Sequence, residues 1–243
     1  MKTLAEVIQL PLAPDEFEAP AGSEPDALLH ASVYSELRRR FITGQIFPGR
    51  SLSTRGLAQE LGVSQTPVRE ALSRLAAEGA IQIRSKRKVG IPPMTSDRFD
   101  DLLRCRLLLE PESAVLALPY MTPARLRRLR EIDGAINTAL ETGDVAAYMQ
   151  GNFAFHFTLY RTHPLKTLNQ LIEILWLQFG PYMRFVYGRV GTAQLVDQHA
   201  VALDALSQGD DARLREAIRG DIADGMGLIG RSALDAEDAA FPG

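Results

Sequence analysis

Hydrophobic residues recur at helical spacing through most of the chain, and one short stretch alternates instead in the manner of β-strands. A first helical pattern covers residues 28–42, and two shorter ones follow on either side of Gly62. The hydroxyls of Ser53 and Ser64 are expected to cap these two short helices. Two short helices joined by a glycine turn are typical of a helix-turn-helix. In the second short helix the apolar positions have the i, i+3, i+4, i+7 spacing of one helix face: Val68, Ala71, Leu72 and Leu75.

The alternating stretch follows Gly79. Apolar and polar residues alternate in "AIQIR", "SKRK" forms a polar tip, and "VGI" resumes the alternation before Pro92 and Pro93 prevent further pairing. A β-hairpin that follows a helix-turn-helix makes a winged helix. The sequence therefore predicts a winged helix over residues 28–95, after a flexible tail at residues 1–27 that is rich in proline and acidic residues.

Beyond the hairpin nearly all apolar positions keep a helical period. Helices are expected near residues 97–118, 123–142, 144–161, 165–188, 191–208 and 210–229, with a kink in the fourth at Pro181. They predict an antiparallel α-helical bundle over residues 96–231, followed by a frayed tail at residues 232–243. The expected fold class is therefore mainly α, with an N-terminal winged helix-turn-helix and a C-terminal helical bundle.

Charge is unevenly distributed along the chain. The net charge is −3, but residues 30–98 hold 12 Lys and Arg against 5 Asp and Glu, a net of +7, whereas residues 1–29 and residues 99–243 each have a net charge of −5. A basic module attracts polyanions, of which nucleic acid is the commonest in the cytoplasm. The chain has no apolar run near the roughly 20 residues of a membrane helix, no secretory signal pattern and a single cysteine. A cytoplasmic protein without a membrane partner is expected.

The first turns of the second short helix carry the side chains suited to base contacts. In a helix-turn-helix this helix enters the major groove, and here it offers Gln65, Thr66 and Arg69 on the side away from its apolar face. Arginine can pair with guanine and glutamine with adenine, so these side chains can read double-stranded DNA. A winged helix that binds another protein is the alternative. Contacts to phosphates or the minor groove are expected from Arg55, Lys86, Arg87 and Lys88.

Polar side chains fall on the inward faces of three bundle helices. His156 lies four residues after Asn152, His199 lies within an apolar stripe, and Asp221 is on the inner side of the last helix. Two imidazoles, a carboxylate and an amide oxygen are the ligand types of a divalent metal site, which suits Zn, Ni or Mn. The alternative is a set of buried polar groups that satisfy one another without a metal.

Two sets of motifs resemble a known family. "LSTRGLAQELGVSQTPVREALSRLAAEGAI" is similar to the DNA-binding domain of GntR-family transcription regulators. "RCRLLLEPESAVLAL", "NFAFHFTLY" and "DQHAVALDALSQGDDARLREAIRGDI" resemble the FadR-type C-terminal (FCD) domain of one branch of that family. The resemblance implies DNA contacts from Arg55 and Arg69, with Ser64 in the same matching stretch. It also implies a metal site in which His156 and His199 match, Asn152 replaces the usual Asp, and Asp221 replaces a third His.

The resemblance further implies a small organic acid as effector. Arg106 and Glu110 repeat the family's Arg-x-x-x-Glu, and Arg106 is expected to hold the carboxylate of the acid, with Tyr182 and Arg184 as further effector-binding donors. The expected function is that of a ligand-responsive transcription regulator, a repressor or an activator, that binds a DNA operator as a homodimer. A metal-dependent hydrolase is the enzymatic alternative, but it lacks a convincing nucleophile or general base, so no enzyme activity is expected.

Overall fold

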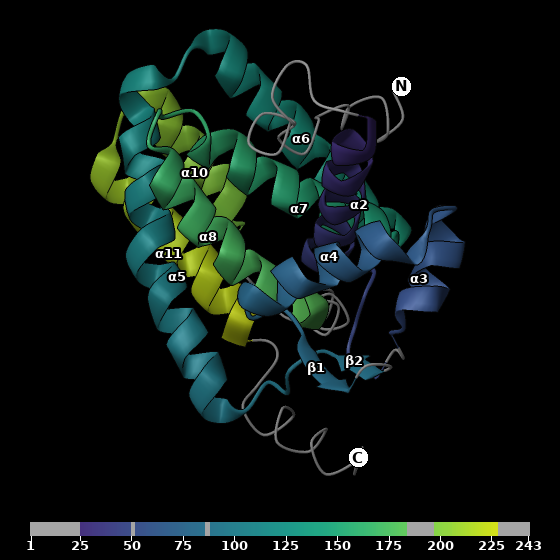
Figure 1. Ribbon diagram of the computed structural model, residues 1–243. Coiled ribbons are helices and arrows are strands. Elements are labelled where there is room, and N and C mark those ends of the chain that lie inside the picture. Colours follow the sequence, from purple (N-terminus) through teal and green to yellow (C-terminus); the bar gives the residue numbers. More distant parts are fainter. Residues whose placement is uncertain (1–24, 50–51, 86–87, 184–196, 228–243) are drawn as a thin grey trace. The chain divides into compact units, whose positions relative to one another are not determined.

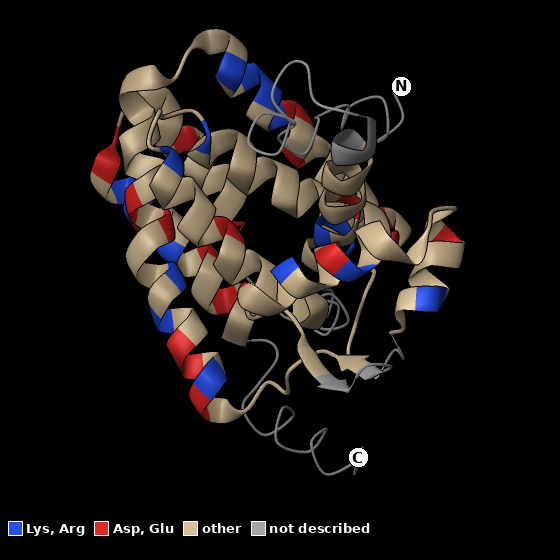
Figure 2. Ribbon diagram, in the orientation of Figure 1, with Lys and Arg blue, Asp and Glu red and all other residues tan. Residues whose placement is uncertain are grey.

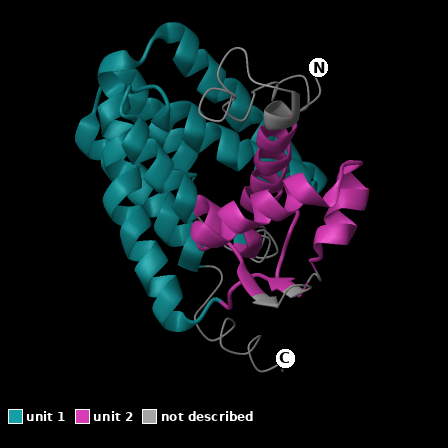
Figure 3. Cartoon of the chain, in the orientation of Figure 1, with its two compact units in different colours: residues 1–9, 94–175, 183–243 teal, residues 10–93, 176–182 magenta. Residues whose placement is uncertain are grey.

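The chain folds into two compact units, which the computed structural model describes over much of their length (Figure 1). Unit 1 comprises residues 1–9, 94–175 and 183–243, and unit 2 comprises residues 10–93 and 176–182 (Figure 3). The described residues are 25–49, 52–85, 88–183 and 197–227. Most of the predicted tail at 1–27, and all of that at 232–243, lies outside them. Residues 25–27 belong to the first described helix.

The helices of unit 2 are α2 (Pro25–Ile42), α3 (Thr54–Leu61) and α4 (Gln65–Ala77). They confirm the predicted order of one longer helix and a helix-turn-helix. α2 packs on α4, and α4 also contacts α3 (Figure 1). The core between them contains seven side chains that are all less than 5% exposed: Val33, Leu37, Phe41, Leu57, Val68, Leu72 and Leu75.

The two short helices differ at their first residues. The Ser53 hydroxyl accepts a hydrogen bond from the Gly56 N–H at 3.0 Å, so it caps α3 as expected. Ser64 occupies the corresponding position before α4, but its side chain forms no capping hydrogen bond, which corrects the prediction. A capping hydroxyl bonds to the second or third N–H of the helix. In α4 the third residue is Pro67, which has no N–H to donate.

The wing is a two-stranded antiparallel sheet made of β1 (Gln82–Ser85) and β2 (Lys88–Gly90). Ile83 lies opposite Val89, and Val89 also forms a bridge with Leu52, before α3. This confirms the predicted hairpin and completes a winged helix-turn-helix.

Unit 1 is a helical bundle built around α7. The elements that lie in it wholly or in part are α5 (Ser96–Ala117), η2 (Leu118–Tyr120), α6 (Pro123–Thr142), α7 (Val145–Tyr160), α8 (Lys166–Phe179), α10 (Gln198–Gln208) and α11 (Asp211–Gly227). α7 has no Lys, Arg, Asp or Glu along its length (Figure 2) and packs between α5 and α6. α11 packs on α5 and α10, and α10 also contacts α6. The predicted antiparallel bundle is therefore confirmed.

The predicted fourth helix ends earlier than its hydrophobic period indicates. α8 stops at Phe179, and the 3₁₀ turn η3 (Gly180–Tyr182) follows it. Pro181 therefore lies in the turn and does not kink a continuing helix over 165–188. Proline has no N–H for the α-helical ladder, which fits a change to a turn. Residues 184–196, where the fifth helix was expected to begin, lie outside the described residues.

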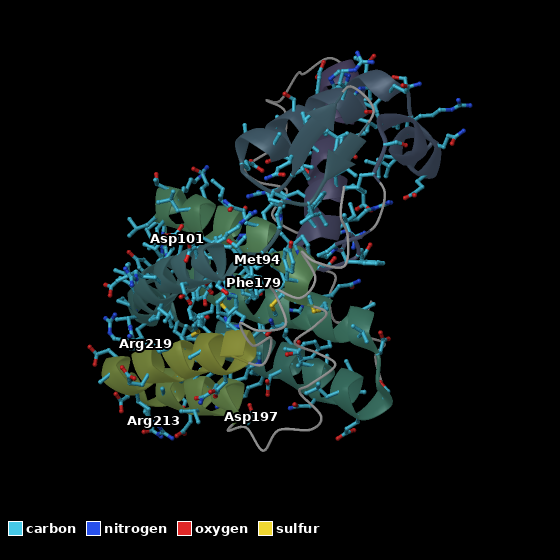
Figure 4. All side chains as sticks on the ribbon, turned by 90° about the horizontal axis from the view of Figure 1, so that it is seen from below. Met94, Asp101, Phe179, Asp197, Arg213 and Arg219 are labelled. Carbon is cyan, nitrogen blue, oxygen red and sulfur yellow. The ribbon has the colours of Figure 1, made fainter. Side chains whose placement is uncertain are left out.

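Ion pairs hold the outer face of α11. Arg213, which lies on α11 with Arg219 (Figure 4), pairs with Asp204 of α10, and Arg215 pairs with Glu112 of α5 at 2.6 Å. Arg219 donates to a backbone carbonyl of α5 at 3.2 Å. Exposed pairs of this kind stabilise little, so the apolar inner face of the helix determines which side of α11 is turned inward. No helix in the described part of the chain is long and apolar enough to cross a membrane.

Unit 2 includes a segment from much later in the chain, residues 176–182. The Gln178 side-chain amide donates to the carbonyl oxygen of Glu78 at the end of α4, over 3.0 Å. The Tyr182 hydroxyl donates to the carbonyl oxygen of Pro92, after the wing, over 2.7 Å. These contacts tie the end of α4 and the segment after the wing to residues about 90 to 100 positions further along.

Candidate DNA-binding surface and buried polar cluster

The exposed face of α4 carries the side chains predicted to read DNA. Pro67, Val68, Ala71, Leu72 and Leu75 are buried against the rest of unit 2. The outward side of the first turns is therefore left to Gln65, Thr66 and Arg69, all exposed. Ser64 and Arg55 are exposed as well. Because Ser64 does not cap α4, its hydroxyl is available for other hydrogen bonds.

Two other charged side chains of α4 are held by α2. The Glu70 carboxylate lies 2.6 Å from Nδ1 of His30, and the Arg74 guanidinium lies over the ring of Tyr34, 3.8 Å from its centroid. Of the predicted wing residues, Lys86 and Arg87 lie outside the described residues. Lys88 is the first residue of β2, and only its backbone is among the described parts of the structure.

In unit 1 the structure brings three of the predicted metal ligands together. His156 on α7, His199 on α10 and Asp221 on α11 each offer one ligand atom, and these atoms lie within 4.8 Å of one another. Nε2 of His156 lies 3.1 Å from the Asp221 carboxylate and 3.4 Å from Nε2 of His199. Nε2 of His199 lies 3.6 Å from the same carboxylate. Both imidazoles therefore direct Nε2 toward one point beside Asp221.

The other nitrogen of each imidazole has its own partner. Nδ1 of His199 lies 3.3 Å from the Asp133 carboxylate of α6, and Nδ1 of His156 lies 3.0 Å from the Tyr160 hydroxyl. A carboxylate only accepts, so Nδ1 of His199 carries a proton, and Nε2 presents a lone pair when the imidazole is neutral. The ring of Phe155 stacks on His199, with centroids 4.0 Å apart, and fixes its plane. Such partners hold an imidazole in the orientation that a metal ligand requires.

The cluster carries an excess of negative charge when the imidazoles are neutral. Glu110, Asp133 and Asp221 contribute three carboxylates, and Arg106 contributes one guanidinium. Burial would raise the pKa of Asp221, but the neighbouring His156 and His199 lower it to about 2. Burial would lower the pKa of His199, but the Asp133 and Asp221 carboxylates raise it above the usual value. These carboxylates stabilise positive charge at the two imidazoles, whether a proton or a cation supplies it.

A pocket adjoins the cluster within unit 1. It is lined by Arg106, Tyr148, Asn152, Met183, Asp221, Ile222, Gly225 and Met226. Its volume, counted as the space open to the centres of water molecules, is about 30 Å³. That is enough for about two waters or a small polar group. The pocket therefore contains the predicted effector-binding Arg106 together with Asn152 and Asp221 of the predicted metal set.

Arg106 is already paired within this pocket. It is 3% exposed, and its Nε donates to the Glu110 carboxylate at 2.5 Å. Tyr182, the second predicted effector residue, lies in unit 2 with its hydroxyl on Pro92 and is not among the lining residues. Arg184 lies outside the described residues.

Two residues of the cluster are absent from the sequence-based set. Asp133 interrupts the inward stripe of α6 formed by Leu129, Ile132 and Ile136, the same signal that indicates His199 on α10. Tyr160 follows His156 by one helical turn, but its place in an apolar stripe conceals its polar role.

The imidazole of His163 is also buried and pairs with a serine, but it is not arranged as a catalytic base. Nδ1 of His163 accepts a hydrogen bond from the Leu165 N–H at 3.1 Å. The proton of a neutral imidazole must then be on Nε2, which lies 2.8 Å from Oγ of Ser113. No lone pair of His163 faces Ser113, so this pair lacks the nucleophile–base geometry of a hydrolase.

A winged helix with an exposed arginine on its recognition helix, joined in one chain to a helical bundle with a buried polar pocket, defines a DNA-binding transcription regulator with a second, all-helical domain. Residues 29–91 match the family described as bacterial regulatory proteins, gntR family, and residues 101–224 match the FCD domain. The chain belongs to the GntR family of transcription regulators, in the branch that carries an FCD domain.

Individual relatives support this assignment. The HTH-type transcriptional regulator McbR of Escherichia coli K12 is 30% identical over 193 residues, which cover 78% of this chain and 87% of McbR. The gluconate operon transcriptional repressor of Bacillus subtilis is 25% identical over 196 residues, covering 76% and 79% of the two chains. The solved structure of E. coli McbR/YncC has a TM-score of 0.78 at 28% identity and covers 84% of this chain and 98% of its own. The family consists of transcription regulators and not enzymes, so the hydrolase alternative is set aside.

Proposed function

We propose that the chain acts in the cytoplasm as a homodimeric transcription regulator whose operator affinity is changed by a small organic acid bound in the helical domain beside a divalent metal ion. The observation that carries the sensing half of this proposal is the convergence of His156, His199 and Asp221 next to a pocket that contains Arg106. The DNA-binding half rests on the family and on the exposed face of α4.

For DNA recognition, we assign the base contacts to Arg69 and Gln65 and the phosphate contacts to Arg55. Ser64, Thr66, Lys86, Arg87 and Lys88 complete the proposed surface. A dimer with a two-fold axis presents two recognition helices to two half-sites of a palindromic operator. A single copy of α4 reads only one half-site, which is why a homodimer is part of the proposal.

The DNA-binding assignment is tested by selecting a preferred duplex from a random pool and measuring its affinity by gel shift. We expect Arg69→Ala to cost about 1–3 kcal/mol on the preferred duplex and less on unrelated DNA. Arg55→Ala should weaken binding to all sequences and reduce the salt slope by about 1. Arg127→Ala removes an exposed arginine from α6 in unit 1 and serves as the matched control. Unchanged sequence preference in Arg69→Ala would show that α4 does not read the bases through this residue.

The donors of the cluster fit a divalent ion. Two imidazole nitrogens with lone pairs and one carboxylate supply three ligands, and three protein ligands leave coordination positions open. Two lone pairs 3.4 Å apart repel each other unless a proton or a cation lies between them. With neutral imidazoles, the excess of two carboxylates over Arg106 matches the charge of a divalent ion.

Asn152 supports the same interpretation. Its side chain is 6% exposed and lines the pocket beside Asp221, so we propose its amide oxygen as a fourth ligand. Replacing nitrogen ligands by oxygen favours harder ions, so Mn joins Zn and Ni as a candidate.

The ion and Arg106 together would select a small carboxylate. A bound divalent ion supplies a Lewis-acidic position for a carboxylate oxygen. Arg106 supplies a guanidinium that can hold such a group through paired hydrogen bonds. The pocket is small, and Arg106, Asn152 and Asp221 make part of its lining polar. A short organic acid is therefore favoured over a long or apolar ligand.

The regulatory step is a shift between two populations of the dimer. An acid that binds one arrangement of the helical domain more tightly favours that arrangement, and we propose that it moves the two recognition helices out of register with their half-sites. A coupling free energy of about 1–3 kcal/mol changes operator occupancy by roughly 5- to 150-fold. In this form the protein is a repressor that the acid releases.

The sensing site is tested on protein purified without chelator. Elemental analysis should find close to one equivalent of Zn, Ni or Mn per chain, and mass spectrometry of the denatured supernatant should identify a carboxylate. His199→Ala should lose the metal, whereas His163→Gln, which changes a buried histidine outside the cluster, should retain it. Metal-free protein that also fails to bind added Zn²⁺, Ni²⁺ or Mn²⁺ would overturn the metal site. Light scattering tests the homodimer: the mass in solution should be twice the 26.7 kDa of one chain, and the mass of a single chain would contradict it.

A further inference from the structure

Glu110 links Arg106 to a longer series of buried hydrogen bonds. One carboxylate oxygen of Glu110, Oε1, accepts from Arg106 Nε, and the other, Oε2, accepts from the Tyr160 hydroxyl at 3.0 Å. The Tyr160 oxygen lies 3.0 Å from Nδ1 of His156. Glu110, Tyr160 and His156 have no exposed surface, so solvent does not compete for these bonds.

The number of protons determines the direction of each bond. A phenol has one proton to donate, and the Tyr160 hydroxyl lies 3.0 Å from the Glu110 carboxylate. A carboxylate paired with Arg106 can only accept, and therefore Tyr160 donates to Glu110. The Tyr160 oxygen is then left to accept, and Nδ1 of His156 must donate to it.

This direction determines which nitrogen of His156 has the lone pair. With a proton held on Nδ1, His156 uses Nε2 for the site, where the Asp221 carboxylate lies 3.1 Å away. Without a cation this carboxylate can accept a second proton from Nε2, and a metal ion would take the place of that proton. The opposite tautomer would direct an N–H toward the point where the three ligand atoms converge. A metal ion has to displace a proton at that point, so the tautomer of His156 changes how tightly the site binds an ion.

We propose that Tyr160 and Glu110 are positioning residues for the metal site: they hold His156 in the tautomer that directs Nε2 at the ion, although neither touches the ion. This inference rests on the proposed metal site and adds two residues to it. Removal of partners that orient metal ligands typically reduces metal affinity by 10–100-fold. Arg106 anchors the far end of the series through its pair with Glu110.

The first experiment measures the affinity for Zn²⁺ alone by calorimetry on the full chain. Tyr160→Phe keeps the ring and removes the hydroxyl, and we expect it to bind Zn²⁺ about 10–100-fold more weakly. Tyr120→Phe removes a hydroxyl from a tyrosine of η2 that is 45% exposed and does not line the pocket, so it should stay close to the wild-type affinity. Circular dichroism establishes that both variants are folded. Wild-type affinity in Tyr160→Phe, or an equal loss in Tyr120→Phe, overturns the proposal.

A double variant tests whether the two residues act in series. Glu110→Gln keeps an acceptor for Tyr160 but removes the charge, so we expect a smaller loss of Zn²⁺ affinity than in Tyr160→Phe. If both act through His156, the double variant should bind no more weakly than Tyr160→Phe alone. Losses that multiply would show that Glu110 acts independently of Tyr160.

The second experiment needs no metal. Long-range ¹H–¹⁵N spectra of the metal-free protein at pH 8 report the tautomer of each histidine. We expect a proton on Nδ1 of His156 in the wild type, whether or not Nε2 carries a second one toward Asp221, and a loss of the Nδ1 proton in Tyr160→Phe. A wild-type His156 whose only proton is on Nε2 overturns the inference, whether or not the protein binds Zn²⁺. Failure of the wild type to bind any of the three metals, with the expected tautomer, contradicts the proposed function instead.

Discussion

Gly180→Ala tests whether the segment 176–182 is an integral part of the winged-helix unit. A Cβ atom at position 180 would lie 2.5 Å from the carbonyl oxygen of Phe41 and 2.7 Å from backbone atoms of Ile42. These neighbours are backbone atoms at the end of α2, so they cannot rotate away as a flexible side chain would. Overpacking of this kind costs about 1–3 kcal/mol, and we expect a loss of that size in the free energy of unfolding of unit 2.

The assay is urea unfolding followed by fluorescence. Trp176 is the only tryptophan of the chain and is 2% exposed within the same segment, so its emission reports on this region directly. With a urea dependence of about 1–3 kcal/mol per molar, the midpoint should fall by on the order of 1 M.

Gly134→Ala is the control for this substitution. Position 134 lies in α6, and an added Cβ there meets no atom within 4 Å. Replacing an unhindered helical glycine by alanine stabilises a helix by about 0.5–1 kcal/mol, so this variant should be slightly more stable than the wild type. A Gly180→Ala protein with a wild-type midpoint would refute the reasoning, because the methyl group fits only if the segment does not dock on α2.

Three further predictions concern stability. Ser53→Ala should lower the free energy of unfolding by about 1 kcal/mol through loss of the α3 cap, whereas Ser64→Ala should change it little; equal losses in urea unfolding would contradict the assignment of the caps. Burial lowers the pKa of His163, so the folded state resists the proton that the unfolded chain takes up, and stability should fall as pH drops through about 6.5. Between pH 7.5 and 5.5 the free energy of unfolding in urea should fall less in His163→Gln than in the wild type. The same fall in both proteins would contradict the assignment of this pH dependence to His163. Leu129→Ala, at a fully buried position, should cost about 2–5 kcal/mol, and a loss below about 1 kcal/mol in urea unfolding would indicate that the α6 core is not packed as described.

Local signals were sufficient to predict the helix-turn-helix. Gly62 and Gly79 end α3 and α4 with positive φ angles of 67° and 74°, a conformation that glycine adopts without strain. Ser53 caps α3 with a side chain only three residues from its partner. The prediction for Ser64 was wrong because it considered only the preference of serine for the capping position. It did not consider that Pro67, the third residue of α4, has no N–H for the serine hydroxyl to bond.

Contacts between distant parts of the chain were beyond prediction from the sequence. The Gln178 to Glu78 hydrogen bond spans 100 residues, and no periodicity or turn motif indicates it. The end of α8 at Phe179 likewise differs from the hydrophobic period, which continues toward residue 188.

The candidate site was predictable only where the signal lies within a single helix. His156 and His199 stand out because each interrupts an apolar stripe on its own helix. The partner Asp133 becomes apparent only when α6 and α10 are packed together. Tyr160 lies one turn after His156 on α7, but its polar role becomes apparent only when Glu110 of α5 lies beside it. The pairing of Arg106 with Glu110 is a one-turn contact within α5, and the motif already indicates it.

The docking of Gln178 and Tyr182 on the winged helix has a consequence for protein engineering. A hybrid joined at residue 95 would take the winged helix from this chain. It would leave behind Gln178 and Tyr182, which donate to the carbonyl oxygens of Glu78 and Pro92. Grafting residues 176–182 together with the N-terminal segment would transfer unit 2 with both of these hydrogen bonds.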